Sequence, residues 1–134
     1  MKILGIEHVA IAVESLEKGS SFWRDIMGLE FKKREDISSQ GVITDIYNLK
    51  NSKIELIKEK LPNSPISKFL EKNGPGIHHI CFEIESIEEA IIELKSKDIK
   101  TIGTSYSIGA EGYKIIFLHP SSTGGVLVEF SQKT

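Results

Sequence analysis

The stretch HVAIAVES at residues 8–15 recurs in altered form as HICFEIES at residues 79–86. The shift that carries residue 8 to residue 79 also aligns Gly5 with Gly76 and Glu17 with Glu88. A self-match at a fixed spacing is a signal about the whole fold. Because only two copies occur, and each is far longer than a solenoid repeat, the pattern indicates a duplicated half-domain with an approximate two-fold axis.

Each copy predicts the order strand, helix, strand, strand, strand. Aliphatic and β-branched residues mark the strands, which we expect at 4–13, 29–33, 42–49 and 53–58 in the first copy and, after the histidine-led strand, at 100–102, 113–118 and 126–131 in the second. The fold class is therefore α+β. We expect a single domain over residues 1–134, made of two βαβββ modules at about 4–58 and 76–131.

Serines mark the predicted helix starts. Ser15 is the expected N-cap of the first helix, in which Leu16, Trp23 and the pair 26–27 fall on one helical face and which Gly28 ends. In the second copy Ser86 with Glu89 three residues later forms a capping box. Between the modules, Ser64 and Pro65 predict a short linking helix that ends at Gly74.

Composition excludes several classes of partner. The formal net charge is −2, with acidic and basic residues mixed along the chain, so no electrostatic footprint for nucleic acid is present. No apolar run reaches the roughly 18 residues of a membrane-span candidate. Cys81 is the only cysteine and cannot form an internal disulfide, which favours a reducing compartment. We therefore expect a cytoplasmic protein that binds neither nucleic acid nor membrane.

The repeat places similar polar side chains at equivalent points of the two modules. His8 and His79 open the first strands, and the last strand of each module carries an acid between two apolar residues, Glu55 and Glu129. Taken alone, each of these is more often an ordinary strand residue. Taken as a symmetric set, two imidazoles and two carboxylates suit one divalent ion per chain, Co²⁺, Ni²⁺, Mn²⁺ or Zn²⁺, with positions left open for substrate.

These residues carry a family resemblance that covers nearly the whole chain. The chain resembles the vicinal oxygen chelate (glyoxalase) superfamily, and within it the methylmalonyl-CoA epimerase family. The matching stretches are IEHVAIAV at 6–13, NSPISKFLEKNG at 63–74, GIHHI at 76–80, IGAEG at 108–112 and FLHPSSTGGVLVE at 117–129. The resemblance implies a glyoxalase-like open barrel built from the two βαβββ modules.

The resemblance also implies a reaction and a set of roles. His8, Glu55, His79 and Glu129 match the metal ligands; His79 rather than His78 takes this role because the repeat aligns it with His8. The implied reaction interconverts (2R)- and (2S)-methylmalonyl-CoA by removing the α-proton through an enolate, with Glu129 and Glu55 as the catalytic carboxylates. The implied partners are an acyl-CoA thioester and a second copy of the chain in a homodimer.

Five further residues are expected to bind substrate: Gln40, Thr44, Lys114, Ser122 and Thr123. Some relatives carry an acid at the position of Thr44, which cannot itself act as a base. The next residue, Asp45, is expected on the other face of its strand, so the second proton carrier stays open. A lysine such as Lys114 is more commonly a solvated strand residue, and a stretch such as 122–125 is more commonly just a flexible turn.

Two other functions stay open from the sequence. Glyoxalase I uses a similar histidine and glutamate set on a glutathione adduct, so the ligands cannot separate it from the epimerase. A bleomycin-resistance-type protein would bind a drug without catalysis, but such proteins tend to lack the full ligand set that this chain retains.

Overall fold

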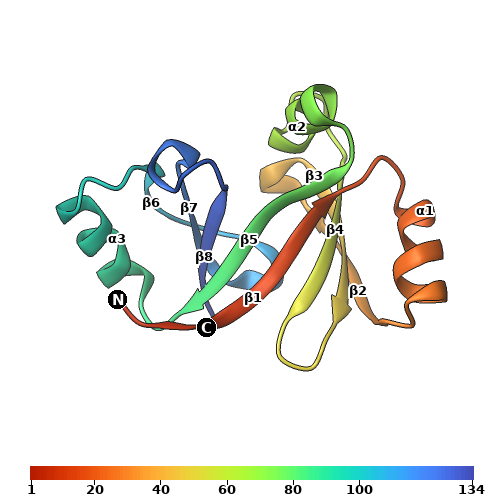
Figure 1. The fold of residues 1–134 in the computed structure, drawn as a ribbon, viewed down its shortest axis with the longest axis horizontal. Helices are drawn as coiled ribbons and strands as arrows, with labels where there is room; N and C mark the ends of the chain where they lie inside the picture. Colours follow the sequence, from red (N-terminus) through yellow and green to blue (C-terminus); the bar gives the residue numbers. More distant parts are fainter. The chain divides into compact units, whose positions relative to one another are not determined.

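The computed structural model describes residues 1–134. Figure 1 shows the elements in chain order. The strands are β1 (Ile3–Ala12), β2 (Glu30–Ile37), β3 (Val42–Asn48), β4 (Lys53–Glu59), β5 (Gly76–Ile84), β6 (Thr101–Ile108), β7 (Lys114–Leu118) and β8 (Val128–Gln132), and the α-helices are α1 (Leu16–Ser20), α2 (Pro65–Asn73) and α3 (Ile87–Ser96). No helix combines the length and apolar character needed to cross a membrane.

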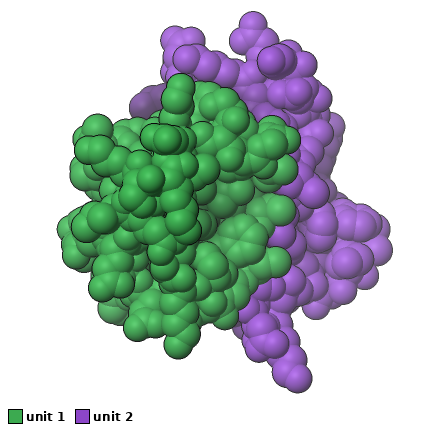
Figure 2. All heavy atoms as spheres, turned by 60° about the vertical axis from the view of Figure 1, so that its left-hand side comes forward, with its two compact units in different colours: residues 1–7, 79–134 green, residues 8–78 purple.

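The chain divides into two compact units, coloured separately in Figure 2. Unit 1 comprises Met1–Glu7 and His79–Thr134, and unit 2 comprises His8–His78. The division therefore falls inside β1 and inside β5.

Both units build their four strands in the same order. In unit 2, β2 pairs antiparallel with β3, β3 antiparallel with β4, and β4 parallel with β1. In unit 1, β6 pairs antiparallel with β7, β7 antiparallel with β8, and β8 parallel with β5. This agreement confirms the duplicated βαβββ order predicted from the repeat.

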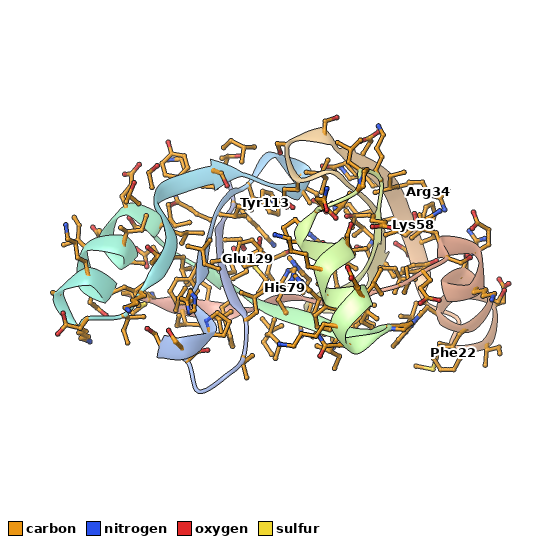
Figure 3. The ribbon with its side chains drawn as sticks, turned by 90° about the horizontal axis from the view of Figure 1, so that it is seen from above. Phe22, Arg34, Lys58, His79, Tyr113 and Glu129 are labelled. Atoms are coloured by element: carbon orange, nitrogen blue, oxygen red, sulfur yellow. The ribbon has the colours of Figure 1, made fainter.

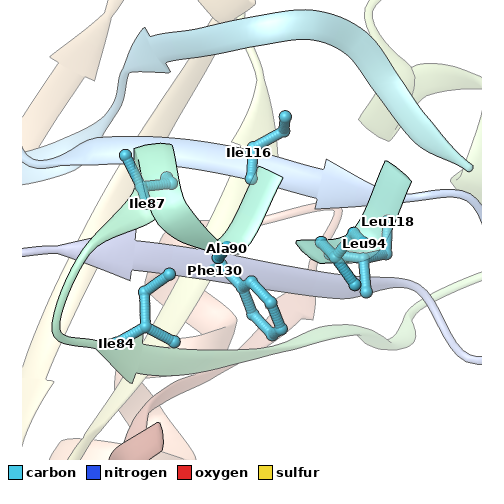
Figure 4. Packing of buried hydrophobic residues seen from close by; sticks show 7 residues of the cluster. All are labelled: Ile84, Ile87, Ala90, Leu94, Ile116, Leu118 and Phe130. Carbon is cyan, nitrogen blue, oxygen red and sulfur yellow. The ribbon is translucent and has the colours of Figure 1, made fainter. Parts of the chain in front are cut away.

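One face of each four-stranded arrangement packs against a helix. In unit 1, α3 covers a buried apolar cluster, shown in Figure 4: Ile84, Ile87, Ala90, Leu94, Ile116, Leu118 and Phe130. In unit 2, Leu16 of α1 packs with Tyr47 and Leu56. Because side chains alternate along a strand, the residues between these core positions point to the opposite face, which we call the open face of each unit.

The first helix departs from the predicted 3.6-residue period. After α1 the chain continues as a π-helical segment, Ser21–Ile26, in which the Met27 N–H donates to the Phe22 carbonyl at 2.8 Å. An i to i+5 bond widens the turn and shifts the following side chains around the axis. Leu16 is buried, but Ile26 is 75% exposed and Met27 53%, so the prediction that they share one face was wrong.

Serine side chains cap all three α-helices. The Ser15, Ser64 and Ser86 hydroxyls accept from the backbone N–H groups of Lys18, Ser67 and Glu89. These bonds satisfy donors that the first helical turn leaves unpaired, which confirms the three predicted starts. Gly74 ends α2 with a φ of 73°, a conformation that glycine adopts without a side-chain clash.

Candidate metal and catalytic site

Unit 1 holds a buried histidine–carboxylate pair on its open face. His79 comes from β5 and Glu129 from the parallel neighbour β8. The His79 Nε2 atom lies 3.0 Å from Glu129 Oε1, and both residues are 5% exposed. Figure 3 shows the two labelled side chains directed toward each other. Glu129 alternates with the core residue Phe130, which turns its carboxylate away from α3.

Unit 2 holds the equivalent pair. His8 lies on β1 and Glu55 on β4, again parallel neighbours, with Glu55 opposite Ala10 in the register. The His8 Nδ1 atom lies 3.1 Å from Glu55 Oε2, and the residues are 6% and 4% exposed. Leu56, the next residue, packs on the α1 side, so Glu55 faces the open side.

The donor chemistry of each pair fits a divalent metal ion. Two ligand atoms that each lie about 2.1 Å from an octahedral ion, at right angles, are roughly 3.0 Å apart, whereas a tetrahedral ion would hold them at about 3.4 Å. The separations of 3.0 and 3.1 Å in the structure match the octahedral value, and they also match the length of a direct hydrogen bond. A buried carboxylate needs a partner of opposite charge or hydrogen-bond donors, and an imidazole with an ion beside it provides both.

Neighbouring side chains orient the unit 1 pair. The ring of Phe117 on β7 meets the His79 ring edge-on, with centroids 5.1 Å apart and planes at 85°.

Cys81 lies two residues after His79 along β5 and is fully buried. Burial raises the pKa of the Cys81 thiol, and the charge of Glu129 raises it further. The thiol is therefore held protonated, and Cys81 is a packing residue, not a nucleophile.

A polar group farther along unit 1 was missed by sequence reasoning. Lys133 Nζ lies 3.4 Å from Glu7 Oε2 and 3.6 Å from Glu83 Oε1, and Glu7 is only 4% exposed. This pairing joins Glu7 on β1 to Lys133, the residue that follows β8. Strand alternation gives the face of each residue but not its long-range partner, so the sequence offered no signal for the contact.

The five predicted substrate-binding residues lie in different surroundings. Gln40 is half-buried in the turn before β3, while Thr44 is buried on the open face of unit 2. The Ser122 hydroxyl accepts from the Lys100 N–H at 3.0 Å, and the Thr123 hydroxyl donates to the Pro120 carbonyl at 3.3 Å, so both hydroxyls hold the loop before β8.

Lys114 lies on the helix-covered face of unit 1. Its Nζ is 3.4 Å from Glu88 Oε1 on α3 and 4.7 Å from the centroid of the Tyr106 ring. Alternation along β7 puts Lys114 on the same face as the core residue Ile116. This position does not favour the substrate-binding role predicted for Lys114, because His79 and Glu129 occupy the other face.

Asp45 carries a structural ion pair. Arg34 donates from Nε to Oδ1 at 2.7 Å and from Nη2 to Oδ2 at 3.0 Å, and this bidentate contact raises the pKa of Arg34. Asp45 shares its face of β3 with the core residue Tyr47. The prediction that Asp45 points away from the face of Thr44 agrees with this arrangement.

Replacing Asp45 with alanine is expected to destabilise the protein by about 1 to 2 kcal/mol, because it removes a buried carboxylate that holds the half-exposed Arg34 side chain in a bidentate ion pair. Urea denaturation measures the loss. Asp36→Ala is the matched control, since Asp36 on the neighbouring strand β2 pairs with Lys60 at the surface and should cost about 0.5 kcal/mol or less. Equal midpoints for the two variants would contradict the structural role.

Unit 2 also contains a cavity of about 550 Å³ beside α2. Its lining includes the acidic residues Glu14, Glu59 and Glu71 and a single basic residue, Lys58. Three carboxylates against one ammonium group give this cavity a negative balance, which would repel the phosphates of a nucleotide. The cavity therefore does not suit the charged end of a coenzyme A molecule.

Comparisons with known proteins identify the family of this chain. Residues 7–117 match the family model of the glyoxalase/bleomycin resistance protein/dioxygenase superfamily. The chain is 43% identical to the mitochondrial methylmalonyl-CoA epimerase of Mus musculus over 98% of its own length and 74% of that protein. It is 42% identical to the ethylmalonyl-CoA/methylmalonyl-CoA epimerase of Cereibacter sphaeroides, covering 95% of this chain and 96% of that one.

A solved structure gives the same result in three dimensions. A variant of Streptomyces coelicolor methylmalonyl-CoA epimerase, in complex with 2-nitronate-propionyl-CoA, superposes with a TM-score of 0.95 at 27% identity, covering 99% of this chain and 96% of that chain. The fold is thus the α+β glyoxalase type. The chain belongs to the glyoxalase/bleomycin resistance protein/dioxygenase superfamily and, within it, to the methylmalonyl-CoA epimerase family.

Proposed function

We propose that this protein is a methylmalonyl-CoA epimerase, an isomerase that interconverts the (2R) and (2S) forms of methylmalonyl-CoA. The supporting relatives bear that name at 42–43% identity, and a structural neighbour binds a nitronate analogue of propionyl-CoA. The observation that carries the proposal is the buried pair of an imidazole and a carboxylate that recurs in each unit.

We infer that His8, Glu55, His79 and Glu129 hold one divalent ion per chain. They are among the buried side chains of this protein that could bind a metal. When bound, such an ion would supply Lewis-acid stabilisation of negative charge on a substrate oxygen. Cobalt, nickel, manganese and zinc all accept this mixed nitrogen and oxygen donor set.

The carboxylates are the proposed proton carriers. Inversion at the α-carbon requires that a proton leave one face of the substrate and that a proton arrive at the other. Glu129 and Glu55 are equivalent under the repeat, and each is oriented by its histidine at 3.0 or 3.1 Å. A carboxylate that binds the ion is a weak base, so one of the two has to leave the ion before it can take the α-proton.

The discriminating experiment follows the α-proton of methylmalonyl-CoA in D₂O by NMR with metal-loaded protein. The proposal expects rapid loss of the α-proton signal together with inversion at the α-carbon. Robust turnover of the hemithioacetal of methylglyoxal and glutathione without this exchange would instead assign the protein as glyoxalase I. Tight drug binding with neither reaction would assign a bleomycin-resistance-type protein.

The remaining partner assignments extend the same proposal. The acyl-CoA thioester is the substrate class that the relatives' names and the bound analogue support. A homodimer and a cytoplasmic location stay predictions, to be measured by light scattering and by fractionation of the cells that make the protein.

A further inference from the structure

Glu7 is a buried carboxylate that the proposed metal site does not use. It lies on β1 with 4% of its surface exposed, and Lys133 Nζ lies 3.4 Å from its Oε2 atom. The same ammonium group is 3.6 Å from Glu83 Oε1 and 5.8 Å from the centroid of the Tyr113 ring. Removing a carboxylate from water is costly unless a positive charge lies beside it, and Lys133 provides that charge.

Glu7 lies close to the proposed metal ligands. It precedes His8 on β1, and neighbours along a strand begin on opposite sides, yet a carboxylate oxygen of Glu7 lies within 4.8 Å of a ring nitrogen of His8. Burial raises the pKa of the Cys81 thiol, and the charges of Glu129 and Glu7 raise it further. Both carboxylates are therefore close enough to Cys81 for their charges to act on it.

A small movement would let Glu7 bind the ion that His8 binds. Two ligand atoms that each lie about 2.1 Å from one ion are at most about 4.2 Å apart. The Glu7 oxygen and the His8 nitrogen lie within 4.8 Å of each other, so a shift of less than about 1 Å satisfies this limit. A buried carboxylate that lost the ammonium group beside it would gain a new positive partner by this shift.

Binding of Glu7 to the ion would impair the proposed centre. The two carboxylates of the proposed ligand set, Glu55 and Glu129, already balance the charge of a divalent ion, because a histidine ligand is neutral. A third carboxylate would give the centre a net negative charge, which weakens its pull on a substrate oxygen and opposes negative charge that develops there. It would also occupy a coordination position that the substrate needs.

We propose that Lys133 is a positioning residue that holds the Glu7 carboxylate outside the coordination sphere of the metal ion, and so keeps a position open for the acyl-CoA substrate. This inference rests on the proposed function and its ligand set. Lys133 is itself held by Glu83 and by the face of the Tyr113 ring. That ring is fixed in turn by its hydroxyl, which donates to Glu111 Oε2 at 3.0 Å.

The main test replaces Lys133 with methionine, which nearly keeps the length of the side chain and removes its charge. Competition with a chromophoric chelator measures the affinity of the folded protein for Mn²⁺, which should rise about 10-fold because a further carboxylate joins the ligands. Proton relaxation of water at the bound Mn²⁺ should weaken, because Glu7 displaces a water molecule. Exchange of the α-proton of methylmalonyl-CoA should slow at least about 10-fold.

Further variants separate this role from a structural one. Adding Glu7→Gln to Lys133→Met replaces the competing carboxylate with an amide, a weaker ligand, and should return all of these measurements to within about 3-fold of the wild type. Lys133→Gln, which keeps a donor but no charge, should change them in the same direction as Lys133→Met and replaces it if that variant does not fold. Lys97→Met is the matched control, since Lys97 also lies 3.4 Å from a carboxylate, that of Glu93 on α3, and should change neither affinity nor exchange.

An unchanged Mn²⁺ affinity of folded Lys133→Met and Lys133→Gln would overturn the assignment and leave the ion pair a role in the fold alone. A raised affinity that Glu7→Gln did not reverse would also overturn it, because Glu7 would then not be the ligand gained. Wild-type protein that bound Mn²⁺ without exchanging the α-proton would refute the proposed function. The affinity and relaxation measurements would still decide whether Lys133 keeps Glu7 from the ion.

Discussion

Replacing Glu129 with glutamine is expected to lower the rate of α-proton exchange of methylmalonyl-CoA about 1,000-fold. The amide keeps the volume of the side chain and its reach to His79 Nε2, 3.0 Å away in the wild type, but it has no basic oxygen and no charge. Both the proposed proton transfer and the metal affinity should therefore suffer. NMR in D₂O measures the exchange, and metal analysis of the same sample separates the two causes.

Glu83→Gln is the matched control for this variant. Glu83 lies on β5, four residues beyond His79, and its contact is Lys133 near the surface. Loss of such a partly solvated pair changes little, so Glu83→Gln should keep the wild-type exchange rate within about 3-fold. A Glu129→Gln enzyme that retained more than about a tenth of the activity would contradict the catalytic assignment, since a lost general base costs on the order of 100-fold or more.

Removal of the metal is the second change with a large expected effect. Dialysis against a chelator should abolish activity, and cobalt, nickel, manganese or zinc should restore it. An ion present at about 100 times its dissociation constant stabilises the folded state by about 2.7 kcal/mol, so the melting temperature of the stripped protein should fall on the order of 10 °C. Thermal denaturation with and without added metal measures this shift.

Two adjacent histidines provide the control for the metal prediction. His79→Ala should bind little metal and show almost no shift on metal addition. His78→Ala should bind metal as the wild type does, because the His78 ring packs edge-on against Phe69 of α2, with centroids 5.1 Å apart. Full activity of thoroughly stripped wild-type protein would show that the buried pairs serve only the fold.

The sequence predicted the architecture because the repeat and the helix caps are local signals. A serine at an N-cap acts within three residues, so Ser15, Ser64 and Ser86 could be recognised without the fold. Alternation along a strand also gave the face of Glu55 and Glu129, since each sits beside a residue that packs on a helix.

Other features depend on information that a local pattern lacks. The π-helical turn before Met27 exposes Ile26, although a 3.6-residue period would have buried it. Strand β6 extends to Ile108, well past the predicted end at residue 102. The prediction ended early because the Gly- and Ser-containing second half of the strand has no alternation of apolar residues to mark it.

Long-range partners were equally hidden. Lys114 pairs with Glu88, 26 residues away, and lies on the helix-covered face. The same limit applies to Lys133 with Glu7, which come from opposite ends of the chain. The face on which a strand residue lies can be inferred from alternation. The charged residue with which it pairs depends on how the strands are arranged, which the local sequence does not give.

A crystal structure of the metal-loaded protein, with the ion located by its anomalous scattering, tests most directly whether both βαβββ modules supply ligands to the same metal ion. We expect one ion per chain with an imidazole nitrogen of His8 and of His79, and a carboxylate oxygen of Glu55 and of Glu129, each about 2.0–2.2 Å away. Two separate ions, an ion held by other residues, or four side chains that fail to meet would contradict the account.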